Sequence, residues 1–152
     1  MKTLVMIATG LTLAIGLYLI VLSMLSRKPA ELGIKAGQLL PCPETPNCVC
    51  SEYSGVSAYV RPMSFSVSSE VAWNKARLAV LGAGGKILTE QLGYLHVRFV
   101  TPIFLFIDDV ELRLDEGGRV IHIRSASRVG RSDLGLNRKR VARIRELFEK
   151  EE

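Results

Sequence analysis

An unbroken apolar run opens the chain. No charged side chain occurs between Leu4 and Leu25, a stretch of 22 residues. A helix of that length extends about 33 Å at 1.5 Å per residue, which is enough to cross a hydrocarbon layer of about 30 Å. The pattern predicts a transmembrane anchor over residues 1–28, with residues 4–25 inside the lipid bilayer.

Two other interpretations of this run remain open. A cleaved signal peptide has a shorter apolar region, of about 7–15 residues, followed by a small-x-small cleavage site. Residues 24–28 read MLSRK and offer no such site. A buried core helix is the second alternative, although core helices seldom have so long an apolar run. We therefore expect an uncleaved, single-pass anchor.

Beyond residue 55, alternating and helical spacings of apolar residues predict a globular domain over residues 56–152. Strands are expected at 57–66, 86–90, 94–100, 109–114 and 119–125, and helices from a Ser68 or Ser69 cap to Gly82 and from an Asn137 cap through Phe148. The expected fold class is α+β, with an N-terminal transmembrane helix followed by one antiparallel sheet of about five strands and two helices packed on it.

The stretch between these parts, residues 29–55, is a tether rich in proline and cysteine. It holds four of the six prolines and all three cysteines. Proline at this density excludes a helix and any central strand. We expect consecutive turns.

The cysteines of the tether predict a disulfide. Cys42 and Cys48 are separated by five residues in a proline-rich turn, and they can form a bridge if the turn folds back in an oxidising compartment. Reduced buried thiols and a metal or redox site are the alternatives. The C-x5-C-x-C spacing does not match structural zinc sites, so no metal is expected. The sequence leaves the redox state of Cys50 open, and a redox protein using Cys50 is one conceivable class.

Net charge narrows the choice of partners. The chain has 20 Lys and Arg against 15 Asp and Glu, a net charge of +5. Because Lys2, Arg27 and Lys28 are in the anchor, the remaining chain has a net charge of only +2, which argues against nucleic acid as a partner. There is no phosphate-binding or dinucleotide-binding glycine motif, and we expect no cofactor.

Two sequence signals conflict on which side of the membrane the domain lies. Arg27, Lys28 and Lys35 outnumber Lys2 across the span, which favours a cytoplasmic domain. The paired cysteines favour an extracytoplasmic, periplasmic domain. We expect the extracytoplasmic side and keep the cytoplasmic side as the alternative.

The charge order of the last predicted helix is reversed. Arg138, Lys139 and Arg140 are in its first turn, where the helix dipole favours acids. A negative counterpart is therefore expected. It is either internal, from Asp108, Asp109 or Glu111, or an external phosphate, carboxylate or lipid headgroup. A solvated basic face near an anionic bilayer is a third interpretation. The candidate ligand-binding residues are Arg124, Ser125, Ser127, Arg128, Asp133, Asn137, Arg138 and Arg140.

Strand alternation places both histidines on one outward face of the sheet, and such a face is normally solvated. His96, His122 and Asp109 are weak catalytic candidates. Ser125 alternates onto the opposite face from His122, and no G-x-S-x-G elbow exists, so a serine hydrolase is disfavoured.

Two stretches of sequence carry a family resemblance. The first is LPCPETPNCV at 40–49, and the second combines DDVE at 108–111, RSASRVG at 124–130 and DLGLNR at 133–138. Together they resemble domain of unknown function 1499, over roughly residues 39–147. Members often have a signal or anchor sequence, and plastid relatives look like thylakoid-lumen proteins, which implies an extracytoplasmic domain. The family implies no activity. Cys50 stands where relatives usually have Ser, and Arg131 where they tend to have an aromatic residue.

These observations predict a membrane-anchored envelope protein whose domain has a binding or scaffolding role. Its expected partner is an anionic small molecule, a lipid headgroup or a protein, recognised through the C-terminal Arg cluster. The alternative is an enzyme acting on an anionic envelope substrate with a histidine as general acid/base.

Overall fold

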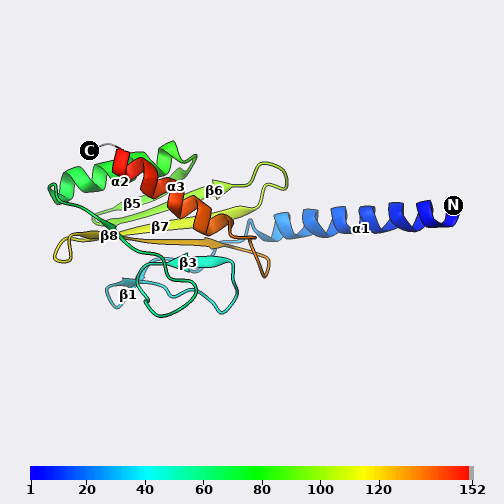
Figure 1. Cartoon of the computed structure of the whole chain (residues 1–152), viewed down its shortest axis with the longest axis horizontal. Helices are drawn as coiled ribbons and strands as arrows, with labels where there is room; N and C mark the ends of the chain where they lie inside the picture. Colours follow the sequence, from blue (N-terminus) through cyan, green and yellow to red (C-terminus); the bar gives the residue numbers. More distant parts are fainter. Residues whose placement is uncertain (151–152) are drawn as a thin grey trace.

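A computed structural model describes residues 1–150 as a long helix followed by an α+β domain (Figure 1). The elements are α1 (Lys2–Leu25), β1 (Ile34–Lys35), β2 (Gln38–Leu39), β3 (Cys48–Cys50), β4 (Met63–Ser64), α2 (Ser69–Gly82), β5 (Lys86–Gln91), β6 (Tyr94–Val100), β7 (Ile107–Asp115), β8 (Val120–Ser127) and α3 (Leu136–Lys150). None of the α1 side chains is buried, and the helix is long and apolar enough to cross a membrane. Such a helix fits either a membrane anchor or a signal sequence.

The main sheet is antiparallel, as predicted, and its strand order is β3-β8-β7-β6-β5, with β4 also paired to β8. It has six strands where about five were expected. Helices α2 and α3 pack on one face, and Figure 1 shows β1 near the opposite face. Apolar residues of β6, β7 and β8 form the core with these helices. The α+β fold class is confirmed.

The strand expected at 57–66 is mostly irregular. Only Met63–Ser64 pairs with β8, and Tyr59 makes a single bridge to Cys50. The reason is that other partners use the backbone of this segment: the carbonyls of Ser57 and Tyr59 accept hydrogen bonds from Arg138.

The tether contains strands that its composition did not predict. β3 pairs with residues 124–126 of β8, and β1 and β2 form a small separate sheet. β3 is at the edge of the main sheet, which is the position that nearby prolines permit.

The polar face of the sheet is not solvated, contrary to expectation. The tether covers it: the Gly33 N–H donates to Glu111 at 2.6 Å, and Leu39 packs against Tyr94. Asp109, Glu111 and Tyr94 are all buried. Burial of so many charged groups requires that each be paired or hydrogen-bonded.

Asn137 is not the cap of α3, contrary to expectation. It is fully buried in the first turn. Asp133 caps the helix instead, because its carboxylate accepts from the backbone N–H groups of Gly135 at 3.0 Å and Asn137 at 2.6 Å. The apolar stripe of α3 is as predicted, with Val141, Ile144 and Phe148 buried.

Candidate functional site

The predicted Arg cluster divides among separate parts of the molecule. Arg124 in β8 and Arg128, the first residue after β8, both line one cavity beside the tether. Arg140 faces the sheet from α3 and contacts Asp108. Arg138 is exposed on α3 at the edge of a different cavity. The cluster is therefore not one continuous surface.

Arg124 is paired with Glu111 across the β7–β8 ladder. Its Nη1 donates to Glu111 Oε2 at 2.9 Å, and both side chains are buried. The hydroxyl of Tyr94 donates to the other Glu111 oxygen at 2.9 Å. Burial, together with this carboxylate, raises the pKa of Tyr94, so the phenol remains a donor.

Arg128 holds Asp109 through two hydrogen bonds. Nε donates to Oδ2 at 2.7 Å and Nη2 to Oδ1 at 2.8 Å, which is the side-on fork geometry of a bidentate pair. His96 Nε2 is 2.8 Å from Asp109 Oδ1. Burial alone would raise the pKa of Asp109, but the hydrogen bonds from Arg128 and His96 outweigh it and lower that pKa.

Arg140 closes a third network on the helix side of the sheet. Its Nη2 donates to Asp108 Oδ2 at 2.5 Å, and its guanidinium stacks over the Phe99 ring at 4.8 Å. Asn137 links the same network by accepting from Ser125 at 2.6 Å and donating to Ser127 at 3.0 Å. Internal carboxylates thus face three of the arginines, and the Asp133 carboxylate accepts hydrogen bonds from backbone N–H groups at the start of α3.

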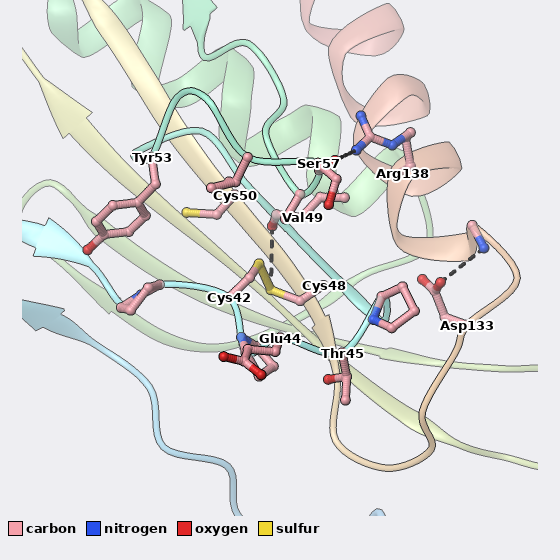
Figure 2. Close-up of a pocket in the computed structure, with 16 residues that line it drawn as sticks. Cys42, Glu44, Thr45, Cys48, Val49, Cys50, Tyr53, Ser57, Asp133 and Arg138 are labelled. Carbon is pink, nitrogen blue, oxygen red and sulfur yellow. Dashed lines mark hydrogen bonds between the residues drawn. A yellow bond between two sulfur atoms is a disulfide. The ribbon is translucent and has the colours of Figure 1, made fainter.

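Arg138 has a different environment. It makes no ion pair within residues 1–150, and it donates to the carbonyls of Ser57 at 2.7 Å and Tyr59 at 3.1 Å. Figure 2 shows its guanidinium directed toward Ser57, above the disulfide loop. The cavity here measures about 530 Å³, but Glu44 and Asp133 line it as well. Two acids beside one arginine do not favour an anion in this cavity.

A second cavity, of about 500 Å³, lies between β8 and the tether. Two arginines, Arg124 and Arg128, and two acids, Glu31 and Asp109, line it, together with Ser127. The Nε of Arg124 is buried and has no hydrogen-bond partner within residues 1–150. Only Nη1 of Arg124 donates to Glu111, so the edge of the guanidinium formed by Nε and Nη2 has no acceptor among the described residues. In Arg128 the same edge donates to Asp109. A buried donor without a partner is costly, so this edge is suited to an acceptor.

The tether cysteines are a disulfide and a free thiol. Cys42 and Cys48 are bonded with their Cα atoms 5.6 Å apart. Cys50 is buried, and its burial raises the pKa of the thiol, which makes it a poor nucleophile. Residues 1–150 contain no group of three His, Cys, Asp or Glu side chains that is arranged for a metal ion.

Both histidines are enclosed by other side chains. His122 Nδ1 is 3.1 Å from the Ser51 hydroxyl and 3.5 Å from Glu52. Burial lowers the pKa of His122, so the ring is neutral at pH 7. Ser51 is buried, and its hydroxyl accepts from the Ile123 N–H at 2.8 Å. These contacts join the tether to β8 and do not present the hydroxyl to a substrate. Neither histidine lines the two cavities described above.

Sequence reasoning missed the tether residues that bond to the sheet and to α3. Glu52 accepts two hydrogen bonds from Arg113, at 2.7 and 3.2 Å, and the Asn47 carbonyl accepts from Asn137 at 2.8 Å. The tether shows no periodicity, so only the density of Asn, Ser and Glu after Pro46 hinted at polar contacts.

Comparison with known proteins gives one match. A family model described as a protein of unknown function (DUF1499) matches residues 38–148, which is more than half of the chain. No curated protein and no solved structure matches the chain. The expected resemblance is confirmed, and its range agrees with the one predicted from the motifs.

Proposed function

The chain belongs to the DUF1499 family, and from its geometry we propose that it is a single-pass, membrane-anchored binding protein of the cell envelope that captures an anionic group. The tether-side cavity between β8 and residues 30–43 is the proposed site. The domain is on the extracytoplasmic side. The ligand is a carboxylate or phosphate group.

One observation carries this proposal: Arg124 lines that cavity, and its buried Nε has no hydrogen-bond partner within residues 1–150. Nε and Nη2 of an arginine are parallel donors that fit the two oxygens of a carboxylate or phosphate. Asp109 also lines the cavity, but Arg128 compensates its charge. Glu31 is a second acid of the lining, but it is exposed, so solvent screens its charge from an anion held at the free edge of Arg124.

Two features support the anchor and its side. α1 is long and apolar enough to span a bilayer, and none of its side chains is buried. The Cys42–Cys48 disulfide is typical of an oxidising compartment. Reporter enzymes fused after Glu152 test on which side of the membrane the domain lies. We expect a fused enzyme that is active only in the periplasm to show activity, and one that is active only in the cytosol to show none. The reverse result contradicts the extracytoplasmic assignment.

The binding site is tested with the full chain in detergent micelles, by thermal unfolding in increasing inorganic phosphate or acetate. Arg124→Lys keeps a positive charge for Glu111 but removes the Nε edge. Arg138→Gln is the matched control, because it removes a cluster arginine outside this cavity. We expect the anions to raise the Tm of the wild type and of Arg138→Gln, and to leave the Tm of Arg124→Lys unchanged. An equal response of all three proteins, or loss in Arg138→Gln alone, rejects the site.

A further inference from the structure

Exposed apolar side chains gather in two connections of the domain. The β6–β7 connection, residues 101–106, contains Ile103 and Phe104, and Ile103 is 81% exposed. The β8–α3 connection, residues 128–135, contains Leu134, which is 89% exposed. Several large apolar side chains presented together on a surface mark a contact with an apolar partner.

Both connections lie beside the C-terminal part of α1. Phe104 and Leu134 line one cavity of about 350 Å³ together with Leu19 and Leu22 of α1. Figure 1 shows the β6–β7 connection extending from the sheet on the side where α1 leaves the domain. Leu19 precedes the end of α1 by six residues, which corresponds to about 9 Å along the helix axis. The two connections therefore reach the level of the last turns of α1.

Hydrogen bonds fix this arrangement at the junction between α1 and the domain. The Ser26 hydroxyl accepts from the Ile107 N–H at 3.2 Å, and Ser26 is fully buried. Arg128 Nη1 donates to the Lys28 carbonyl at 3.1 Å. Because β7 and β8 hold the end of α1, the apolar connections stay beside it.

We propose that the β6–β7 connection and Leu134 insert into the boundary between the headgroups and acyl chains of the bilayer, so that the domain rests on the membrane surface. This inference depends on the proposed function, because it requires α1 to span the bilayer. The occupant is lipid because the patch is continuous with the surface of α1 itself. Arg27, Lys28 and Arg131 are exposed next to the patch, and their charges suit lipid phosphates.

Depth-dependent quenching tests the proposal. An environment-sensitive fluorophore is attached to the full chain at Ile103→Cys, in a Cys50→Ser background that leaves one free thiol. Matched controls carry the label at Leu92→Cys and Leu13→Cys. Leu92 is fully exposed in the β5–β6 turn, at the opposite end of β6 from Ile103, and Leu13 is in the middle of α1. The proteins are placed in vesicles of phosphatidylcholine and phosphatidylglycerol that contain acyl-chain spin-labelled lipids.

We expect the label at 103 to lose most of its emission, as the label at 13 does, while the label at 92 keeps its emission. A quenched label at 13 with an unquenched label at 103 overturns the insertion and leaves the anchor standing. Unquenched labels at both 13 and 103 overturn the anchor and therefore the proposed function as well. Self-quenching between copies at 103 without quenching by lipid assigns the patch to a second copy and also overturns the insertion.

Discussion

Replacing Arg128 with Gln removes the cation that faces a carboxylate with almost no contact with solvent. The side chain of Asp109 is 1% exposed and that of Arg128 is 10% exposed, so solvent screens their interaction little. Removing one partner of a buried pair costs about 3–5 kcal/mol, because the other charge stays buried and uncompensated. His96 remains beside Asp109, so we expect Arg128→Gln to lose about 3 kcal/mol of unfolding free energy, at the low end of that range.

The assay is urea unfolding of the full chain in mild detergent, followed by the fluorescence of Trp73, the single tryptophan, which packs against the core. The double variant Arg128→Gln with Asp109→Asn removes both charges and leaves two amides that can pair. We expect it to recover about half of the loss, about 1–2 kcal/mol, because no buried charge is then left uncompensated. Arg138→Gln is the control, because that guanidinium is exposed and touches only backbone carbonyls.

The pH dependence gives a second check on the same pair. The folded-state pKa of Asp109 is lowered, so the stability it contributes is present above its ordinary pKa of about 4 and is lost as the pH falls through the folded value. The gap between wild type and Arg128→Gln is therefore widest near pH 7 and narrows as the pH falls toward and below about 4. A loss under about 0.5 kcal/mol at pH 7, typical of a surface pair, refutes this reasoning.

Four further predictions concern the tether, the helix-side network and His122. Cys42→Ser with Cys48→Ser lowers the unfolding free energy by about 2–3 kcal/mol, and reducing the wild type has the same effect. Asn137→Ala leaves buried partners in Ser125 and the tether unsatisfied, so urea unfolding registers a loss of about 3 kcal/mol. Because the folded pKa of His122 lies below 6.5, its contribution to stability is fully present above pH 6.5 and declines as the pH falls, and His122→Gln flattens that slope in unfolding curves measured from pH 5 to 7. Cys50 reacts with iodoacetamide far more slowly in the native chain at pH 8 than in urea, as measured by mass spectrometry.

The last three of these predictions have a control or a contradicting result. Asn74→Ala, at an exposed position of α2, is the control for Asn137 and should change stability by less than about 0.5 kcal/mol. If the stability of His122→Gln has the wild-type dependence on pH between pH 5 and 7, a group other than His122 causes that dependence. Equal labelling of Cys50 in native and unfolded chains contradicts its burial.

The amino-acid sequence by itself determined the parts of the molecule that depend on local periodicity. The apolar run predicts α1, helical spacing predicts α2 and α3, and period-two alternation predicts β5 to β8 and their antiparallel pairing. These elements follow from residues a few positions apart. Proline density and the short Cys42–Cys48 spacing are likewise local signals, and the disulfide is present.

Tertiary structure alone decided what covers the polar face of the sheet. Alternation states on which side of a strand Glu111 or Asp109 lies, but not whether water or protein lies opposite. Gly33 meets Glu111 from 78 residues away, and Glu52 meets Arg113 from 61 residues away, so no window of sequence contains both partners. Arg124 and Arg128 are likewise more than 75 residues from the tether segment, residues 30–43, that lines their cavity. Charge order predicted that the Arg cluster needs negative partners, and only the folded chain determined that internal carboxylates face three of its arginines while one edge of Arg124 is left free.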